Sequence, residues 1–187
     1  MIHPQPISES DSTLLSINSL REWTRTTNEE FSDVELLDLG LGALHYVEGK
    51  SSVILLPRIY TARFSDFCDY YIPLYPFVSI DTIKYRDADN VEQTLSATDY
   101  TVESYSKVNN RLVYTATSLP TVYDRWDAVT VTMKAGYGHN ADNLPSNIRQ
   151  SIRHLVRYWY DNPDSPKKEA PSLVDDIIRT FAIDVFA

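Results

Sequence analysis

Apolar residues recur every three or four positions between residues 32 and 48, and this spacing predicts a helix. Its expected core face carries four aliphatic side chains: Val34, Leu37, Leu41 and Leu44. Gly40 and Gly42 interrupt the same stretch, and glycine lowers helix stability because its backbone loses the most freedom on folding. Two glycines inside a helix therefore suggest that a neighbouring element packs closely there.

Two further helices are expected from capping residues and spacing. Ser16 is a candidate N-cap for a short helix that reaches Trp23. Asn143 or Asp142 can cap a longer helix with Pro145 in its first turn. One face of this longer helix carries Ile148, Ile152, Leu155, Val156 and Trp159. Its apolar face predicts that it packs on the core of the molecule.

A last helix is predicted to begin at Ser172, after a proline-containing and charged linker over residues 162–169. Four apolar residues recur along one side of it: Leu173, Ile177, Phe181 and Val185. A monomer would have to leave this side in contact with water or fold it back on itself. We therefore expect residues 171–187 to reach outward and dock on another protein rather than complete the subunit's own core.

The middle of the chain has the residues typical of antiparallel strands. Turn-forming residues at 87–90 separate two β-prone stretches and predict a hairpin. The stretches expected to be extended are 53–56, 59–67, 78–85, 91–95, 100–105, 111–115 and 128–135. The chain is therefore expected to be α+β, with N-terminal helices and a C-terminal helix packed with an antiparallel β-meander, plus an outward-reaching C-terminal helix.

The expected domain organisation follows from these elements. Residues 1–13 are polar, contain Pro4 and Pro6, and show no period, so they are interpreted as a flexible arm. Residues 14–162 would form one domain, since their apolar content is enough for a single core. Residues 163–187 would be a linker followed by the docking segment.

The net charge of the chain is −9, which argues against a protein that grips nucleic acid over its whole surface. Cys68 is the single cysteine, so no disulfide can form within the chain, and a reducing cytoplasm is the simpler expectation. The first residues lack the apolar core of a signal peptide, and the aliphatic run at 53–56 is too short to span a bilayer. We therefore expect a soluble protein with no membrane association.

The candidate reactive groups favour structural roles. Residues 136–138 read Gly-Tyr-Gly, which lacks the third glycine of a dinucleotide loop and favours a turn. Residues 87–92 begin like a calcium loop, but Thr98 stands where a bidentate acid is needed. The four histidines are scattered, Cys68 has no activating base beside it, and the acids at 175–176 point about 100° apart on a helix. We expect no enzyme activity, no catalytic residue, no cofactor and no metal.

Three arginines form the most informative polar set. Arg149, Arg153 and Arg157 are spaced by four, which stacks them as one basic stripe beside the apolar face of their helix. One hypothesis is an acidic partner: a neighbouring subunit, another protein or passing DNA. The other is a solvated face balanced by Asp161 and other surface carboxylates.

The chain resembles the head-tail connector, or head-completion adaptor, proteins of tailed bacteriophages over roughly half its length. Four motifs carry the resemblance by their order and spacing. The first is Pro-Leu-Tyr-Pro-Phe-Val-Ser-Ile from Pro73, with the hairpin and Thr94–Tyr100 that follow, and the second is the strand 129–133 running into Ala135-Gly136-Tyr137-Gly138. The third is Asn143-Leu144-Pro145-Ser146-Asn147-Ile148-Arg149, and the fourth is Trp159-Tyr160-Asp161-Asn162. In the N-terminal third, Leu41–Glu48 also matches the end of the family's second helix.

This resemblance implies a virion structural protein of the neck, assembled in the host cytoplasm. Its copies would form a ring, expected to be a dodecamer, beneath the portal protein and above a stopper or tail protein, with double-stranded DNA passing through the lumen without sequence-specific binding. The portal contact would then be made by four apolar residues of the last helix: Leu173, Ile177, Phe181 and Val185. The arginine stripe would contact a neighbouring subunit or a partner protein. A tail-associated carbohydrate-binding β-module, using the chain's many tyrosines, is the alternative, and an enzyme is third.

Overall fold

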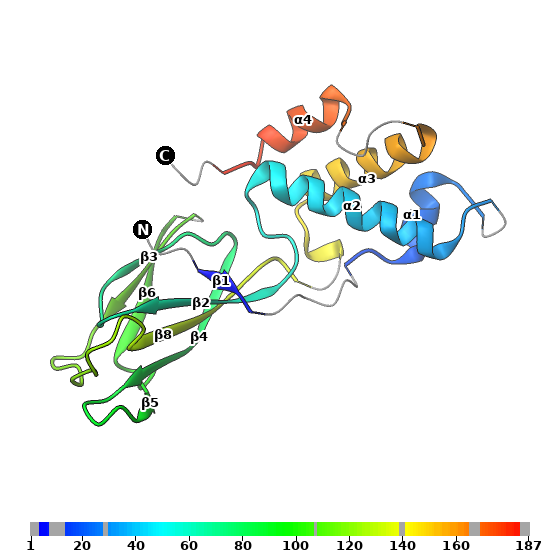
Figure 1. Ribbon diagram of the computed structural model, residues 1–187. Coiled ribbons are helices and arrows are strands. Elements are labelled where there is room, and N and C mark those ends of the chain that lie inside the picture. The colour runs from blue at the N-terminus through cyan, green and yellow to red at the C-terminus, as the bar shows by residue number, and fades with distance from the viewer. Residues whose placement is uncertain are drawn as a thin grey trace. The chain divides into compact units, whose positions relative to one another are not determined.

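A computed structural model describes residues 4–7, 14–27, 30–106, 108–138, 141–164 and 169–183. The chain divides into two compact units: a strand-built unit of residues 1–10 and 57–136, and a helical unit of residues 11–56 and 137–187 (Figure 1). Each unit therefore combines segments far apart in the sequence. Strand pairs and helix pairs each bury their apolar faces among themselves. The expected division into an arm over 1–13, a domain over 14–162 and a linker with docking segment over 163–187 stays a prediction.

Two antiparallel sheets make up the strand-built unit. The first has the order β1-β2-β8-β4-β5 and the second the order β3-β7-β6. Their bounds are β1 Gln5–Pro6, β2 Arg58–Phe64, β3 Tyr70–Ile72, β4 Phe77–Arg86, β5 Glu92–Thr94, β6 Tyr100–Ser106, β7 Asn109–Tyr114 and β8 Val129–Ala135. The antiparallel strands and the β4–β5 hairpin confirm the α+β prediction. The strand order adds that β8 lies between β2 and β4, which sequence neighbours alone do not imply.

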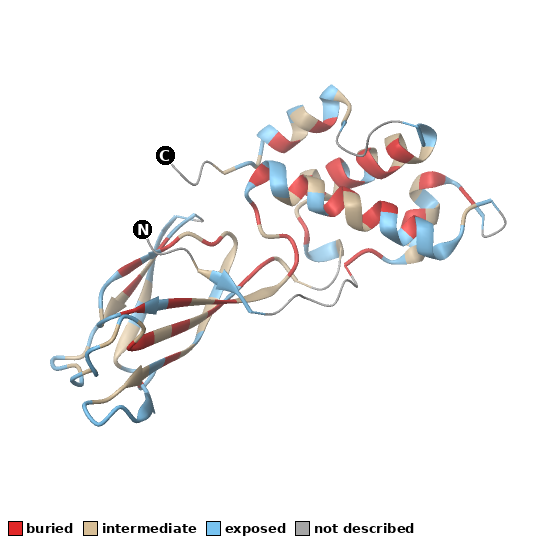
Figure 2. Ribbon diagram, in the orientation of Figure 1, coloured by how far each residue is buried: buried red, intermediate tan, exposed pale blue. Residues whose placement is uncertain are grey.

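The core of this unit lies between the two sheets. In β8 every second residue is buried, from Val129 to Ala135, as expected for a central strand with one face inward (Figure 2). The ring of Phe64 in β2 meets that of Tyr70 in β3 edge to face, with centroids 5.0 Å apart. Phe67 makes similar contacts with strands of both sheets. Aromatic pairs of this geometry join the sheets in addition to the area that they bury.

The N-terminal arm contributes to the same unit. Gln5 and Pro6 pair with Thr61 and Tyr60 at the edge of β2, and the Ile7 amide donates to the Ile59 carbonyl at 2.8 Å. No structure was expected for residues 1–13, and residues 1–3 and 8–13 lie outside the described ones. The described part of the arm therefore adds a short edge strand.

Within the described residues, the helical unit consists of four α-helices and a short 3-10 helix. Their bounds are α1 Ile17–Thr24, α2 Asp33–Ser51, η1 Ala141–Asn143, α3 Ser146–Asp161 and α4 Ser172–Arg179. Helix α3 packs against the other three helices, and α1 and α4 each also contact α2. The predicted core face of α3 is confirmed, since its five apolar residues are all buried together with Ser151. Pro145, rather than Asp142 or Asn143, occupies the N-cap position.

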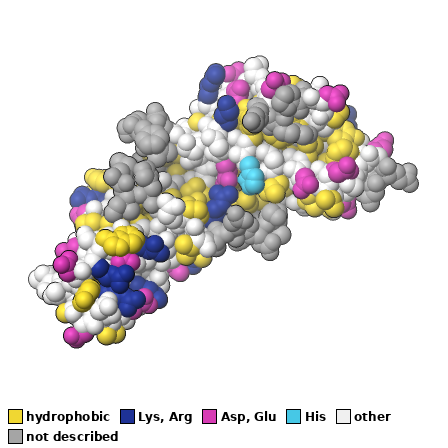
Figure 3. All heavy atoms as spheres, viewed as in Figure 1, with side chains coloured by type: hydrophobic (Ala, Val, Ile, Leu, Met, Phe, Trp, Pro, Cys, Tyr) yellow, Lys and Arg dark blue, Asp and Glu magenta, His cyan; other side chains and the backbone are white. Residues whose placement is uncertain are grey.

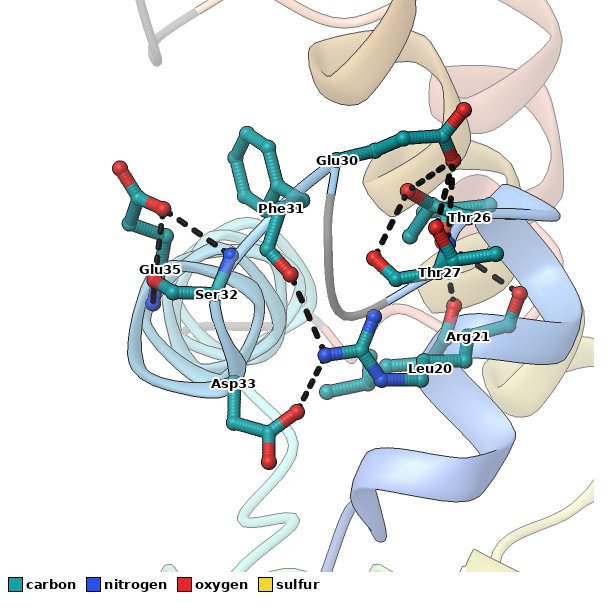
Figure 4. Close-up of polar contacts among 10 residues, drawn as sticks. Leu20, Arg21, Thr26, Thr27, Glu30, Phe31, Ser32, Asp33 and Glu35 are labelled. Carbon is teal, nitrogen blue, oxygen red and sulfur yellow. Dashed lines mark hydrogen bonds and ion pairs between the residues drawn. The ribbon is translucent and has the colours of Figure 1, made fainter.

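Polar contacts surround the start of α2 and join it to α1 (Figure 4). Arg21 donates to the carbonyl oxygen of Phe31 at 3.2 Å and forms an ion pair with Asp33. Ser32 and Glu35 form a reciprocal capping box, in which each side chain accepts a hydrogen bond from the other residue's backbone amide. These contacts satisfy amides at the start of α2 that no helix carbonyl can reach.

The predicted core face of α2 is mostly wrong. The helix forms, but it buries Leu36, Leu39, Ala43, Leu44 and Val47, together with Gly40 and Ser51. Val34 and Leu37 are exposed and Leu41 is intermediate, so only Leu44 of the predicted face is buried. The helix is apolar on two sides, and spacing alone does not identify which side meets α1 and α3.

Residues 53–56 were predicted as a strand, and that prediction is wrong. They form an irregular segment of the helical unit in which Val53, Leu55 and Leu56 are buried. The carboxylate of Glu48 accepts hydrogen bonds from the amides of Leu55, at 2.7 Å, and Leu56, at 3.2 Å. An acceptor from the preceding helix thus replaces the pairing that a sheet would provide.

Helix α4 packs within the helical unit. Val174 and Ile178 are buried, the Trp159 indole nitrogen donates to the carbonyl oxygen of Glu169 at 2.8 Å, and Tyr46 donates to Asp175 at 3.3 Å. This packing differs from the expectation of a segment that reaches outward from the subunit's own core. The helix has a second apolar side, and the buried one begins one residue after the stripe that the spacing suggested.

Candidate interaction surfaces

A basic groove runs between the end of α1 and the outer face of α3. It has a volume of about 810 Å³, and none of its described lining residues is acidic. The lining comprises Trp23, Arg25, Ser146, Arg149, Gln150, Arg153, His154 and Arg157. The structure thus brings the three predicted arginines together on one surface, which we call the basic groove.

The three arginines of the stripe have different neighbours. Arg149 forms an ion pair with the exposed Asp142 at 3.0 Å. Arg157 pairs with Asp161 at 2.7 Å, donates to the carbonyl oxygen of Thr24, and lies over the ring of Tyr160. Arg153 is exposed and has no ion pair within the described residues. Arg153 is therefore the stripe's most available cation, whereas Arg157 also ties α3 to α1.

Sequence reasoning missed Arg25, Trp23 and His154 as members of the groove. Arg25 is the C-cap of α1 and has a left-handed backbone, with φ of 56°. Trp23 was predicted only as part of a short helix, and His154 was only one of four scattered histidines. The helical spacing of residues 149–157 gave no signal for α1, because its position beside α3 is a tertiary contact.

A second surface lies on the outer side of α2. Val34 is 69% exposed and Leu37 41% exposed, and Asp38 and Leu41 share this side of the helix. We call these four residues the outer stripe. Leu37, Asp38 and Leu41 also border a groove of about 520 Å³ whose other lining residues are Leu15, Ser16, Leu44 and Leu56. The stripe is thus an apolar helix face with a carboxylate at its centre.

Two of the predicted portal-contacting residues, Leu173 and Ile177, lie on the less buried side of α4, and Phe181 follows the end of the helix. Leu173 is 53% exposed, and Ile177 and Phe181 are intermediate. Val185 lies outside the described residues. The structure therefore leaves Leu173 available to a partner, while the same helix uses Val174 and Ile178 for its own packing.

The strand-built unit carries paired charges and exposed rings. Figure 3 shows Lys and Arg side chains gathered over it, with Asp and Glu side chains among them. Lys84 pairs with Glu92 at 2.8 Å, and Arg125 forms a bidentate ion pair with Asp127. Exposed aromatic residues of this unit are Tyr71, Tyr105, Tyr123 and Trp126. Most of its basic groups thus have acidic partners already.

The acids considered for chemistry have structural contacts. Asp87 accepts hydrogen bonds from the amides of Asp89 and Val91 and from the Gln93 side chain, and the Gln93 contact is the main reason that the pKa of Asp87 lies below its ordinary value. This supports the β-turn interpretation. In the acidic pair of α4, Asp175 contacts Tyr46, whereas Asp176 pairs with Arg179 at 3.0 Å.

The remaining candidates are the cysteine and the Gly-Tyr-Gly segment. Cys68 is exposed in the single chain, and its pKa is raised by partial burial and by the carboxylates of Asp66 and Asp69. Gly136 and Gly138 have φ of 117° and 140°, as expected in a turn. Within the described ranges, no group of three His, Cys, Asp or Glu residues could hold a metal, and no helix could cross a membrane.

Comparison with known proteins finds no matching family model and no matching curated protein. Solved structures with the same fold include a chain in the neck of an empty gene transfer agent particle computed with C6 symmetry. That chain is 19% identical with a TM-score of 0.75, and the match covers 96% of this chain and 95% of that one. A chain in the virion of a native gene transfer agent particle is 19% identical, with a TM-score of 0.73 and coverage of 96% and 94%.

A third match is a chain in the neck of a native gene transfer agent particle computed with C12 symmetry, 18% identical, with a TM-score of 0.72 and coverage of 96% and 94%. At these identities the likeness is one of fold. Over nearly its full length this chain has the fold of a chain found in particle necks, which agrees with its resemblance in sequence to the head-tail connector proteins.

Proposed function

We propose that this protein is a structural adaptor in the neck of a tailed phage or phage-like particle. The observation that carries the proposal is the fold shared over 96% of the chain with chains of gene transfer agent particles, two of them from necks. The resemblance of residues 73–162 to head-tail connectors points to the same role from the sequence. The work of such a protein is geometric, and no reacting group is required for it.

In this proposal, copies of the chain form a ring beneath the portal and above a stopper or tail protein. A ring of twelve is consistent with the C6 and C12 symmetries of the neck structures that share the fold. A repeated head-to-tail contact closes into a ring when its rotation divides the circle. Such a ring would extend the conduit for DNA and match the portal to the tail, within a virion assembled in the host cytoplasm.

The charge of the chain suits a conduit. With a net charge of −9, a ring of identical copies would repel phosphate over much of its surface and let DNA slide through. The exposed side of α4, with Leu173, Ile177 and Phe181, is the proposed contact with the portal. Because Val174 and Ile178 anchor the helix, this contact would be made by a docked helix rather than by a free arm.

Imaging of the whole particle tests the proposal. An electron cryomicroscopy map of the virion should contain this fold as a ring at the capsid vertex, between portal and tail. Binding of the purified chain to purified portal gives a second test in solution. Density for the chain only at the distal tail, together with glycan binding by the monomer through residues such as Trp126, would instead support the carbohydrate-binding module.

A further inference from the structure

The helical unit carries two surfaces of complementary character, and we propose that they bind each other between neighbouring copies of this chain. The basic groove of one copy would receive the outer stripe of α2 from the next copy. The inference rests on the proposed function in one respect, namely that copies of the chain assemble side by side.

The groove has unsatisfied positive charge. Arg25 and Arg153 are both exposed and have no ion pair within the described part of the chain, while Arg149 and Arg157 are partly balanced by Asp142 and Asp161. Trp23 and the aliphatic stems of the arginines provide apolar surface along the same wall. A partner with apolar side chains beside a carboxylate fits this combination, since a purely acidic segment would make no apolar contact with Trp23.

The outer stripe has that combination of groups. Val34 and Leu37 present apolar surface, and Asp38 lies between them and Leu41 on the same side of α2. Asp38 has no ion pair within the described residues. Glu35 lies beside the stripe, and its capping contacts with Ser32 leave it negatively charged, since they hold the pKa of its carboxyl below the ordinary value. The stripe thus offers apolar contacts together with negative charge.

The two surfaces lie on opposite sides of one unit. Side chains of an α-helix advance by about 100° per residue, so Val34, Asp38 and Leu41 project opposite to the buried Leu36 and Ala43. By the same geometry, residues 153 and 157 of α3 project away from its buried face, and residue 149 lies at the edge of that face. Because α2 and α3 pack together, their outer faces point away from each other. In Figure 4, Glu35 accordingly lies on the side of α2 turned away from α1.

Opposite and complementary surfaces produce a heterologous contact. Each copy then uses a different face toward each neighbour, which allows the assembly to close as a ring. The contact also explains why α2 keeps apolar residues at helical spacing on a side that its own core does not use. Exposed apolar patches of this kind commonly mark interaction sites.

Charge reversal tests the pairing. Arg25→Glu with Arg153→Glu replaces the two cations of the groove that have no ion pair by anions, and Val34→Lys with Asp38→Lys makes the stripe basic. Each double variant should keep the melting temperature of the wild type, because all four side chains are exposed, but should weaken copy-to-copy association by about tenfold or more. A chain with all four changes should regain association, because both surfaces are reversed together. Association is measured by analytical ultracentrifugation of the free protein and by electron microscopy of rings formed on purified portal.

Cross-linking gives an independent test. In a Cys68→Ser background, Val34→Cys combined with Gln150→Cys should give chains linked copy to copy after mild oxidation, whereas either cysteine substitution alone should give no product beyond a dimer. Two outcomes would overturn the pairing while leaving the proposed function intact. In one, the double-cysteine variant forms rings on the portal without a cross-link between positions 34 and 150. In the other, the chain with all four charge changes associates no better than the double variants while the wild type forms rings. Failure of the wild type to bind portal at all would count against the proposed function instead. Salt-sensitive binding of a short DNA duplex to the groove, with no cross-link, would identify DNA as its occupant and refute the pairing.

Discussion

At the scale of single residues, the three arginines of α3 differ in what surrounds their guanidinium groups. Arg157 reaches a backbone carbonyl of α1 and lies over an aromatic ring, whereas Arg153 extends into the groove with no partner in the described chain. From their spacing of four residues alone, the three side chains would be expected to have the same role. Their surroundings make one of them part of the fold and leave another free for binding.

This difference gives a prediction for paired substitutions. Arg157→Ala should lower the free energy of unfolding by about 1 kcal/mol, since it removes a hydrogen bond between helices. Arg149→Glu with Arg153→Glu should leave the melting temperature nearly unchanged, because exposed ion pairs contribute only about 0–1 kcal/mol, yet should weaken assembly. Urea unfolding measures the first effect and sedimentation the second. Unfolding of the Arg149/Arg153 variant would show that the whole stripe is structural.

The two glycines of α2 provide a matched pair. A Cβ atom at Gly40 would lie 2.9 Å from a methyl carbon of the buried Leu20, whereas at Gly42 it would meet only Trp159, at 3.5 Å. Gly42→Ala should therefore stabilise the protein by about 0.5–1 kcal/mol, the usual gain of alanine over glycine in a helix. Gly40→Ala should destabilise the protein, because crowding against Leu20 would outweigh that gain. Thermal unfolding compares them, and equal gains from both would contradict the close approach of α1.

Stability at alkaline pH should depend on Tyr70. Burial raises the pKa of Tyr70 to about 12, from an ordinary value of about 10. Because the folded-state pKa is the higher one, the contribution of the neutral phenol is fully present below about pH 10 and is lost as the pH rises toward about 12. The melting temperature should fall across this window, and less steeply in Tyr70→Phe. Tyr71→Phe, which alters the exposed neighbour on the same strand, is the control and should follow the wild-type curve.

At the scale of elements, α2 and α4 each have two apolar sides and use one of them for the subunit's own core. In α2 the inner side meets α1 and α3, and Val34 and Leu37 remain outside. In α4 the inner side holds Val174 and Ile178, and Leu173 remains outside. Helices of this kind can complete a core and still present an apolar surface to a partner, so their two sides can be tested separately.

For α4 we predict opposite effects on its two sides. Ile178→Ala should destabilise the subunit by about 2–5 kcal/mol, because it leaves a cavity against its neighbouring helices. Leu173→Ser should leave the melting temperature nearly unchanged but reduce binding to purified portal. Deletion of residues 171–187 is a poorer test, since it removes both sides together. Full portal binding by Leu173→Ser would rule out this side of the helix as the portal contact.

At the scale of the whole molecule, two compact units share a chain with a large negative charge. Self-repulsion opposes the close approach of identical subunits at low salt. The proposed contact between groove and stripe places opposite charges together, but it involves only a few groups of each copy. A template that holds neighbours in register would therefore favour the ring.

We accordingly predict that free protein at low concentration and low salt is monomeric or polydisperse, and that added portal converts it to rings. Light scattering coupled to size-exclusion chromatography measures the first state, and electron microscopy of the mixture measures the second. Raised salt should increase association of the free protein by screening its net charge. A stable ring of the free chain under dilute, low-salt conditions would refute the need for a template.

Most of the helices and strands of this protein are encoded locally along the chain. The helix over residues 146–161, the strand over 129–135 and the hairpin around residues 87–90 follow from local spacing and turn chemistry, and the structure confirms them. The three arginines were placed on one surface for the same reason, since a helix fixes the relative directions of its own side chains. Even the reciprocal cap of α2 depends only on Ser32 and the residue three positions later.

Local patterns do not show which apolar side of α2 and of α4 is buried, because both sides have helical spacing and the choice depends on where α3 lies. The same holds for the segment 53–56, whose β-prone residues are buried against helices after Glu48 satisfies their amides. It also holds for the placement of β8 between β2 and β4 and for the arrival of Arg25 and Trp23 beside the arginine stripe. Local patterns predict which residues avoid water, whereas contacts between distant segments determine which helices or strands bury them.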